Sequence, residues 1–586
     1  MFGNIIYISD TMAHVKLLPN SKIAANLMNV HVVFEDGNSR ILGEISDIDG
    51  EKIKVNFLGE FDGNKFNSGI LRKPTLSSRL RLINKEELAI IIGVDKKEGN
   101  LFIGKSVLYN GYPICVSTND LFSNHMAIFG NTGSGKSCGV ARIMQNLFSN
   151  PNFIPYNANF LFFDSYGEYH SAFKDLNKLN PNYNFKFFGT NSNLEANKQI
   201  RIPLWLLNMD DFALILDATK HSQLQIIERM LQIVNVFSGD QEQAKRYKNH
   251  LIAKAIMDIL YTNQTAASKR NDVFDLIATC NTKEFSLETQ VQGVGYTRSF
   301  RNCFMIDTKG NFPELNLLTE YVTGFIDDEY DKLENKLPGY YTLEDLENAL
   351  NFTLISEGML RNESLYDDAI LLKVRMHSLV NGDYNRFFRY PEYVTLENYV
   401  ASLVATETGK AQIINFNLDK VDDSFAKVLT KIFSRLLFVF AKKLENRASI
   451  PFHIVLEESH RYVQADTDRF LLGYNIFERI AKEGRKYGII LDLISQRPVE
   501  LSETVLSQCS NFLIFKMTHP RDIEYISKML PNISADIIEK QKSLQPGTCV
   551  AFGRSFKVPM IIKLDMPSPE PQSGNCDVVD RWQVRN

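Results

Sequence analysis

Residues 127–145, AIFGNTGSGKSCGVARIMQ, decide the fold of this chain. Within this stretch, Gly130-Asn131-Thr132-Gly133-Ser134-Gly135-Lys136-Ser137 fits the pattern G-x-x-x-x-G-K-[ST]. An apolar run at 126–129 precedes the pattern, and a run of helical periodicity at 140–148 follows it. Strand, glycine loop and helix therefore stand in the order that a phosphate-binding loop requires.

The residue types of this loop indicate its chemistry. The glycines let consecutive backbone N–H groups turn toward a phosphate, and the helix that follows directs its positive dipole end at the same place. Lys136 would reach the β- and γ-phosphates, and the Ser137 hydroxyl would bind Mg²⁺. An ordinary glycine-rich turn would not need the flanking strand and helix. We therefore predict that the chain binds a nucleoside triphosphate.

Composition limits the class of protein. The 586 residues suffice for several cores, and 44% hydrophobic with 23% charged residues exclude wholesale disorder. With 65 basic and 69 acidic residues the net charge is -4. A protein that coats nucleic acid over its whole surface would be basic, so any DNA contact must be local, such as a lined channel.

Cysteine usage and hydropathy bear on the compartment. The seven cysteines are scattered without a C-x-x-C pair, which indicates neither a disulfide framework nor a zinc site. They are typical of reduced thiols in a cytoplasm. The first ten residues, MFGNIIYISD, lack the features of a signal peptide, and no run of 18 apolar residues occurs. We expect a cytoplasmic protein without a membrane span.

Two strand-like runs end in acids. Asp164 and, four residues later, Glu168 follow the first run, while Glu457 and Glu458 follow the second. Carboxylates at the carboxyl ends of strands beside a phosphate loop lie in the ligand crevice of an α/β sheet. Asp164 and Glu168 would order Mg²⁺ or the attacking water; alternatively, Asp164 caps the next helix. Of the second pair, one acid would hold Mg²⁺ through water and the other would polarise the water that attacks the γ-phosphate.

Two further polar residues lie near the second acid pair in the sequence. Gln496 ends a buried strand that follows, where it would sense the γ-phosphate or only bond the backbone. Arg485 precedes the same strand and would serve as an arginine finger toward the nucleotide of a neighbouring subunit. The alternative for Arg485 is a cation that stabilises a helix C-terminus.

The pattern along the chain predicts four parts. Residues 1–105 have Asp-Gly turns at 36–37, 49–50 and 62–63 between strand-like runs, which predicts hairpins that close into a small β-barrel with a structural or docking role. Residues 106–210 and 400–565 predict an α/β core, a parallel sheet with helices on both faces.

The other two parts are an insertion and an arm. Residues 211–399 predict a helical insertion, whose basic clusters at 245–250 and around Arg298 and Arg301 indicate a solvated face or a nucleic-acid contact. Residues 566–586 predict an extended arm, and Trp582 suggests that it docks.

Through these residues and several further motifs, the chain resembles the HerA family of the HerA and FtsK group of P-loop ATPases. The resemblance covers the core and the β-rich start, and the helical insertion only loosely. It rests on Gly130 to Ser137, on Phe163-Asp164 with Gly167-Glu168-Tyr169, on Pro203-Leu204-Trp205-Leu206-Leu207-Asn208, on Leu456-Glu457-Glu458-Ser459-His460, and on 482–488 followed by Ser495-Gln496-Arg497-Pro498.

The resemblance implies a RecA-like core in a hexameric ring that hydrolyses ATP with Mg²⁺ at subunit interfaces and translocates double-stranded DNA. It also implies a partner, either a nuclease such as NurA or, in anti-phage systems, a sirtuin-type or nuclease effector. Carried over, Lys136 and Ser137 bind phosphate and Mg²⁺, Glu458 activates water with Glu457 beside the metal, and Arg485 is the interface arginine. Arg479 is the second candidate for that last role.

Two departures from related motifs occur. P-loop proteins in general have Asp where Glu457 stands, although HerA proteins commonly carry paired glutamates, and Ser459 replaces the usual small Ala. The functional hypotheses are an ATP-driven DNA motor, a conjugative or segregation pump, and a ring scaffold that controls an effector enzyme. Pumps are usually anchored by membrane segments, and a scaffold would be free to lose the acids, Gln496 and Arg485.

Overall fold

The computed structural model describes residues 3–18, 27–93, 99–238, 242–327, 329–330, 339–356, 363–465, 471–529, 535–574 and 578–582. The chain forms two compact units. One unit consists of Met1–Lys198, Val400–Asp466 and Tyr474–Asn586, and the other of Gln199–Tyr399 and Thr467–Gly473. The predicted domain boundaries at 105, 210, 400 and 565 stay predictions.

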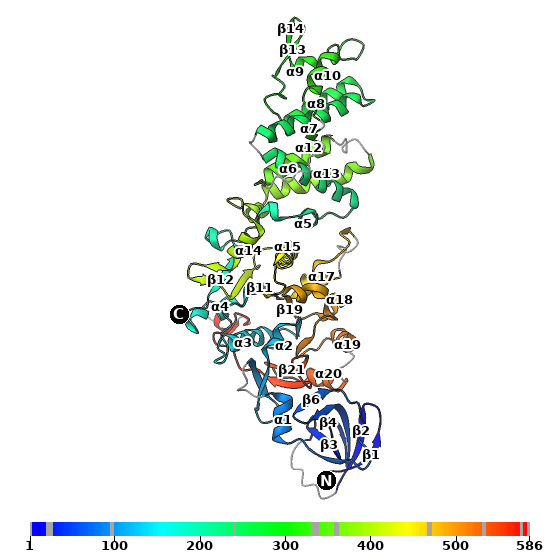
Figure 1. Cartoon of the computed structure of the whole chain (residues 1–586), viewed down its shortest axis with the longest axis vertical. Helices are drawn as coiled ribbons and strands as arrows, with labels where there is room; N and C mark the ends of the chain where they lie inside the picture. Colours follow the sequence, from blue (N-terminus) through cyan, green and yellow to red (C-terminus); the bar gives the residue numbers. More distant parts are fainter. Residues whose placement is uncertain are drawn as a thin grey trace. The chain divides into compact units, whose positions relative to one another are not determined.

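A large sheet organises the first unit (Figure 1). Within the described residues it has eleven strands in the order β12-β17-β11-β18-β19-β10-β20-β21-β22-β8-β9. Their bounds are β8 Asn100–Ser106, β9 Pro113–Ser117, β10 Met126–Phe129, β11 Phe160–Asp164, β12 Phe185–Gly189, β17 Ile413–Asn417, β18 Phe452–Leu456, β19 Ile489–Ser495, β20 Asn511–Phe515, β21 Thr548–Gly553 and β22 Met560–Lys563.

The sheet is mixed, which corrects the prediction of a parallel sheet. The first seven strands in this order, from β12 at the edge to β20, pair in parallel. From β20 onward, β21, β22, β8 and β9 pair antiparallel. Hairpins join β21 to β22 and β8 to β9 without a crossover helix, and β8 pairs with β22 from the other end of the chain, so the alternation of strand and helix in the sequence could not reveal this extension.

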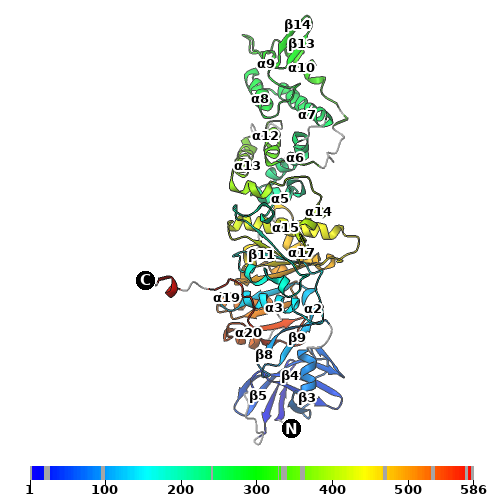
Figure 2. The same cartoon turned by 90° about the vertical axis from the view of Figure 1, so that its left-hand side faces the viewer.

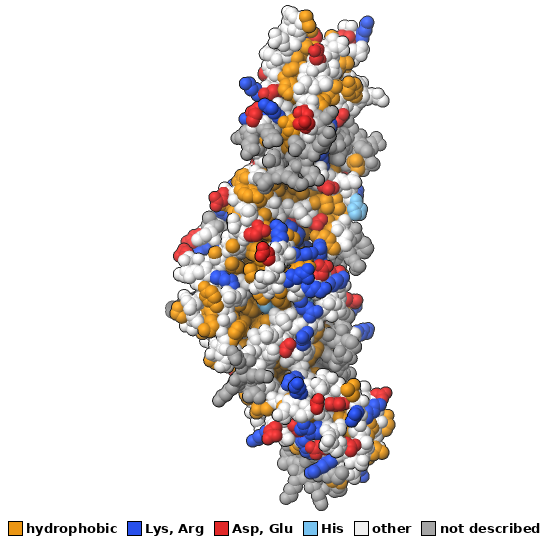
Figure 3. Space-filling view, in the orientation of Figure 1, with side chains coloured by type: hydrophobic (Ala, Val, Ile, Leu, Met, Phe, Trp, Pro, Cys, Tyr) orange, Lys and Arg blue, Asp and Glu red, His pale blue; other side chains and the backbone are white. Residues whose placement is uncertain are grey.

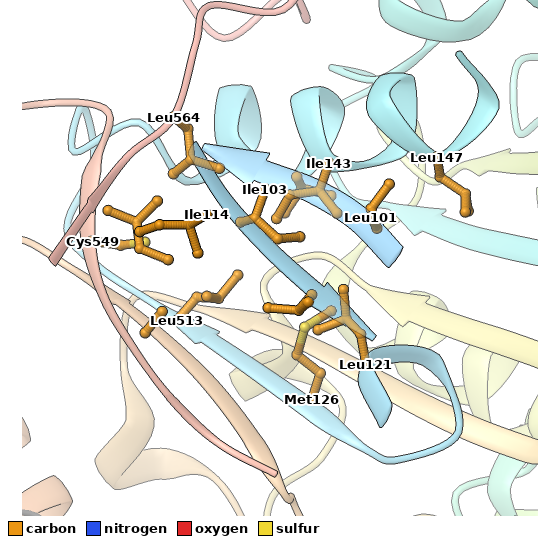
Figure 4. Packing of buried hydrophobic residues seen from close by; sticks show 14 of the residues in the cluster. Leu101, Ile103, Ile114, Leu121, Met126, Ile143, Leu147, Leu513, Cys549 and Leu564 are labelled. Carbon is orange, nitrogen blue, oxygen red and sulfur yellow. The ribbon is translucent and has the colours of Figure 1, made fainter. Parts of the chain in front are cut away.

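Helices cover both faces of the sheet, as predicted. Side chains alternate along a strand, so one strand supplies both faces. On one face α3 (Lys136–Phe148) packs Ile143 and Leu147 into a buried cluster with Leu101 and Ile103 of β8 (Figure 4). On the other face the ring of Phe433, from α15 (Asp423–Lys443), lies 6.0 Å from that of Phe163. Burying each such side chain stabilises the fold by about 1.5–3 kcal/mol.

A second sheet lies at the start of the chain. Its strands are β1 Gly3–Ile8, β2 Met12–Leu17, β3 His31–Asp36, β4 Ser39–Asp49, β5 Lys52–Asp62, β6 Lys65–Ser68 and β7 Arg79–Leu82. The predicted Asp-Gly turns join β3 to β4, β4 to β5 and β5 to β6, and their glycines have φ of 58°, 58° and 56°. Only glycine adopts this conformation without strain, which confirms the hairpins.

The predicted closure of this sheet into a barrel is not shown. Among the described strands the order is β1-β2-β5-β4-β3-β7, with β6 on β5, and β1 and β7 stand at opposite ends. A helix that the prediction omitted, α1 (Lys85–Ile92), packs Leu88 and Ile91 into the same buried cluster as Val33 and Leu42 of this sheet. Covering by a helix is an alternative to closure for hiding a sheet face.

The second unit is mainly helical, as predicted (Figure 2). Its elements are α5 Met209–Ile215, α6 His221–Ser238, α7 Glu242–Tyr261, α8 Ala266–Thr279, α9 Phe300–Cys303, α10 Leu315–Thr323, α12 Leu343–Ser356, α13 Glu363–Asn381, and the hairpin of β13 Gln290–Gly293 and β14 Tyr296–Ser299. Arg298 and Arg301 pair with Glu314 at 3.0 Å and Glu288 at 3.6 Å. These arginines therefore have acidic partners within their own unit.

The remaining elements are short or lie between the strands already named. They are α2 Thr118–Phe122, α4 His170–Phe173, α14 Leu396–Val404, α17 Ile476–Glu483, α18 Glu503–Leu506, α19 Pro520–Met529, α20 Ala535–Lys542, α21 Val578–Trp582, β15 Ala405–Thr406, β16 Gly409–Lys410, and the 3-10 turns η1 Leu176–Lys178, η2 Ala196–Lys198, η3 Leu204–Leu206, η5 Asp383–Phe388, η6 Ser459–Arg461, η7 Gly484–Tyr487 and η8 Pro498–Glu500.

Candidate nucleotide site

The glycine loop joins β10 to α3 at the carboxyl edge of the parallel strands. Gly133 and Gly135 have φ of 73° and 95°, in the left-handed region. A Cβ on Gly135 would lie 2.7 Å from the backbone nitrogen of Gly547, so a side chain there would displace the main chain. The loop thus needs glycine both for its conformation and for its packing.

Hydrogen bonds from neighbouring strands hold the loop. The backbone N–H of Asn131 donates to Lys516 O at 2.9 Å, and its side-chain Nδ2 donates to Thr518 Oγ1 at 2.6 Å. The N–H of Gly547 donates to Ser134 O at 3.0 Å. Thr132 Oγ1 donates to Gln496 Oε1 at 2.5 Å. The loop conformation is therefore fixed by the protein itself.

Glu458 is connected to the loop through Gln496. Strand β19, which Gln496 follows, pairs with β10 on one side and with β18 on the other. The Gln496 amide donates from Nε2 to Glu458 Oε1 and accepts from Thr132 at Oε1. Glu458 has φ 49° and ψ 46°, a left-handed conformation that costs a residue with a side chain about 1–3 kcal/mol and tends to occur at functional sites.

Asp164 is engaged by the loop that follows β11. Its Oδ1 accepts from Glu168 N at 3.0 Å, and its Oδ2 accepts from Tyr169 N at 3.0 Å and from Asn415 Nδ2 at 2.9 Å. These N–H groups precede α4, whose N-cap is Tyr169, so Asp164 holds the loop before that helix and does not cap the helix itself. A ligand role for Asp164 stays a prediction.

Lys136 is buried among three carboxylates. Burial lowers its pKa, whereas Glu457, Glu458 and Glu168 act on it in the opposite direction. Burial also raises the pKa of Glu168, whose carboxylate accepts a hydrogen bond from Ser137. Three acids around one lysine would repel a bare triphosphate, so the cluster fits a nucleotide that brings a divalent cation.

Two buried oxygens at the loop, Ser134 Oγ and Glu168 Oε2, have no hydrogen-bond partner among the described residues; a third, Glu458 Oε2, makes no hydrogen bond but lies 3.3 Å from His460 Nδ1. Buried polar atoms without partners are costly, and an incoming ligand or its water can supply the partner. Oxygen donors of this kind suit Mg²⁺, which keeps several waters and takes few protein ligands. The residues present thus fit MgATP, with Ser137 and Glu457 as the predicted metal ligands.

Arg485 lies at the other edge of the sheet. It belongs to η7, immediately before the start of β19, and its Nη1 donates to Asn124 Oδ1 at 2.7 Å. The seven residues of β19 span about 20 Å between Arg485 and the edge that carries the loop. Arg485 therefore cannot reach the nucleotide of its own chain, and its predicted role toward a neighbouring subunit stays a prediction. Arg479, on α17, lies over the ring of Tyr474 at 5.5 Å.

The chain's C-terminal segment contacts the site, which the sequence did not indicate. Gln145 of α3 donates from Nε2 to Pro569 O at 2.8 Å and accepts at Oε1 from Ser568 N at 2.9 Å. Gln572 N donates to Glu168 O at 2.9 Å, and Ser573 Oγ lies 3.9 Å from Cys138 Sγ. Residues 566–573, here called the C-terminal strap, thus lie along α3. The predicted docking residue Trp582 is instead 82% exposed.

Two buried tyrosines were also not predicted. Tyr169 Oη donates to Glu457 Oε2 at 2.7 Å, and Tyr462 Oη lies 2.7 Å from Ser165 Oγ. The Tyr of the Gly167-Glu168-Tyr169 stretch was noted only as part of a motif. Its partner could not be inferred, because the two residues are 288 positions apart in the chain.

Comparisons with known proteins find similarity to HerA helicases. The model described as the central domain of helicase HerA matches residues 101–290. The DNA double-strand break repair helicase HerA of Sulfurisphaera tokodaii is 23% identical over 537 residues, which are 91% of this chain and 81% of that protein. The HerA of Sulfolobus acidocaldarius is 24% identical over 539 residues, with the same 91% and 81% coverage. Over most of its length the chain is therefore similar to HerA helicases, and residues 101–290 match the central domain of that family.

This similarity supports an ATPase activity of the helicase class. Among solved structures, VirB4 of Thermoanaerobacter pseudethanolicus resembles it with a TM-score of 0.44 and 12% identity, covering 80% of this chain and 97% of VirB4. Across the helices that the structure describes, none is both long enough and apolar enough to cross a membrane.

Proposed function

We propose that this chain is the subunit of a hexameric ring that hydrolyses ATP and translocates double-stranded DNA. The observation that carries the proposal is the hydrogen-bonded connection Thr132–Gln496–Glu458, which links the phosphate loop to the acid placed to activate water. A chain kept only as a scaffold has no need for this connection or for the buried oxygens without hydrogen bonds beside it.

In the proposed reaction each residue of the site has a distinct role. The loop N–H groups and Lys136 would hold the phosphates, and Ser137 with Glu457 would hold Mg²⁺, which when bound would supply positive charge against the phosphates. Glu458 accepts the proton of the attacking water. Gln496 keeps the Glu458 carboxylate fixed relative to the loop, so that a change at the γ-phosphate is transmitted to the acid.

The position of Arg485 supports a ring. If an arginine about 20 Å of strand length from its own loop acts on a nucleotide, that nucleotide must belong to another subunit. In an equal mixture of Glu458→Gln and Arg485→Ala subunits, roughly a quarter of interfaces would pair an intact acid with an intact arginine. Recovered ATP turnover at about that level supports the assignment; no recovery removes its main support.

A basic surface on the first unit supports contact with a polyanion. Figure 3 shows Lys and Arg side chains gathered over the region of α15 and α17. Lys442 and Arg447 lie over the ring of Tyr487 at 5.5 and 5.7 Å, and Arg479 lies over Phe438 at 5.8 Å. Phosphate contacts dominate DNA affinity. Lys442 and Arg479 are 37 positions apart in the chain, so the sequence did not show these basic residues as one cluster.

The test is ATP hydrolysis by the purified protein with and without long double-stranded DNA, with its mass in solution measured in the same buffer. Strong stimulation of a hexamer by DNA is the expected result. A hexamer that hydrolyses slowly and ignores DNA would instead favour a ring scaffold for an effector enzyme. The partner we propose in either case is a nuclease or a sirtuin-type effector, which co-purification with the candidate enzymes would identify.

A further inference from the structure

The hydroxyl of Tyr169 contacts the first acid of the pair. Tyr169 Oη donates to Glu457 Oε2 at 2.7 Å, and the side chains belong to residues that are 0% and 3% exposed. Bulk water is excluded from this contact. A hydrogen bond to a charged group typically contributes about 1.5–3 kcal/mol, more than a bond between neutral groups.

The position of that hydroxyl is set by packing. The ring of Tyr169 is stacked on Phe173, with centroids 6.0 Å apart and planes at 4°, and lies 5.2 Å from the ring of Phe162. Its backbone N–H is held by Asp164 Oδ2 at 3.0 Å. Strand β11 and the Asp164 carboxylate therefore place the hydroxyl before any ligand arrives.

The contact restricts the Glu457 carboxylate. Burial and the neighbouring Glu458 raise the pKa of Glu457 well above its ordinary value, and the hydrogen bond from Tyr169 acts in the opposite direction because a donor stabilises the charged form. With Oε2 engaged by the hydroxyl, the carboxylate cannot rotate freely. Oε1 is then the oxygen that can hold a metal ion or one of its waters.

We propose that Tyr169 is a positioning residue of this site, which orients Glu457 to hold the Mg²⁺ of the bound nucleotide. The inference rests on the proposed ATPase chemistry and does not require DNA or a ring. Outer partners that orient metal-binding side chains typically change metal affinity by about 10–100-fold when they are removed.

The chain offers a matched control in Tyr462. Its hydroxyl donates to Ser165 Oγ at 2.7 Å, and Ser165 Oγ in turn donates to the backbone oxygen of Glu457 at 2.9 Å. Tyr462 is also fully buried. Tyr169→Phe and Tyr462→Phe each remove one buried hydroxyl from the same network, but only the first hydroxyl contacts the carboxylate.

The experiment measures binding of ATPγS by calorimetry while Mg²⁺ is varied, and again in EDTA. For Tyr169→Phe we expect the Mg²⁺ concentration at half-maximal binding to rise about tenfold or more, with unchanged affinity in EDTA. For Tyr462→Phe we expect a shift of less than about twofold. An equal shift in both variants, or no shift in Tyr169→Phe, would overturn the proposal.

A second variant tests whether a folding defect, and not the lost hydrogen bond, explains the result for Tyr169→Phe. Glu457→Asp keeps the tyrosine but withdraws the carboxylate from it by one methylene, and must raise the Mg²⁺ requirement in the same direction. Adding Tyr169→Phe to Glu457→Asp should then change little; a further full shift would refute the coupling. A wild-type protein that binds Mg-ATPγS but ignores DNA would remove the proposed motor and leave this inference standing.

Discussion

The hold of the C-terminal strap on α3 can be perturbed at one residue. Gln145 is 6% exposed, and its amide makes reciprocal hydrogen bonds with Ser568 N and Pro569 O at 2.9 and 2.8 Å. Gln145→Leu keeps the approximate size of the side chain and removes both bonds to the strap, together with a longer bond from Nε2 to Ala172 O at 3.5 Å. The matched control is Asn146→Leu on the same helix, because Asn146 Nδ2 donates to Phe102 O at 3.1 Å and not to the strap.

The magnitude follows from the two bonds. Each typically contributes about 0.5–1.5 kcal/mol net, so their loss should favour release of the strap by about 1–3 kcal/mol. At a factor of ten for each 1.4 kcal/mol, the released population would rise by about 5- to 150-fold. Cys138 reports release, because Ser573 of the strap lies beside its sulfur and burial raises the pKa of its thiol.

The assay is the rate at which a thiol-exchange reagent modifies Cys138, in a background where Cys576 is replaced by Ser. The other described cysteines are buried: Cys115, Cys280, Cys303, Cys509 and Cys549. When strap opening is fast relative to modification, the rate follows the released population. We expect faster modification in Gln145→Leu and no change in Asn146→Leu. Unchanged rates in Gln145→Leu, or equal acceleration in both variants, would refute the reasoning.

Three further outcomes are expected. Glu458→Gln should retain MgATP binding, because an amide oxygen can still accept from Gln496, while ATP turnover falls by about 10²–10⁴-fold; retained hydrolysis would mean that another acid activates water. Asp164→Asn should lower the free energy of unfolding, measured in urea, by about 1–3 kcal/mol, because a backbone donor loses its acceptor. Unchanged stability together with an altered Mg²⁺ requirement would favour the ligand role of Asp164. Burial, with a smaller effect of Lys540, lowers the pKa of His31 from 6.5 to about 4, so the stability contributed by the neutral imidazole is complete above about pH 6.5 and is lost toward pH 4. The urea midpoint should therefore decrease less between pH 7 and pH 4.5 in His31→Gln than in the wild-type protein. An equal decrease in both proteins would contradict a role for His31.

The sequence was most informative where chemistry is local. The loop from Gly130 to Ser137 requires particular residues at consecutive positions, and the acids Glu457 and Glu458 follow directly on a buried strand. The structure brings Gln496 into contact with both the loop and Glu458. The roles of these residues stay predictions, but their proximity follows from strands that end at one edge of a parallel sheet.

Features that depend on distant pairings could not be predicted. Nothing in residues 100–117 signals that β8 and β9 join the large sheet, because the register is set by β22 near the other end of the chain. Tyr169 contacts Glu457 only after β11 and β18 have paired. Helix α1 was overlooked although it has a local signal, the capping box of Asn84 and Glu87.

The pairing of β8 with β22 also has a consequence for synthesis on the ribosome. Lys105 and Asp565, which form an ion pair beside these strands, are 460 positions apart in the chain. At about 5–20 residues per second, roughly 25–90 s pass between their emergence. During that interval the apolar strand β8 has no β22 to cover its edge, so the nascent chain presents a binding site for chaperones until translation is nearly complete.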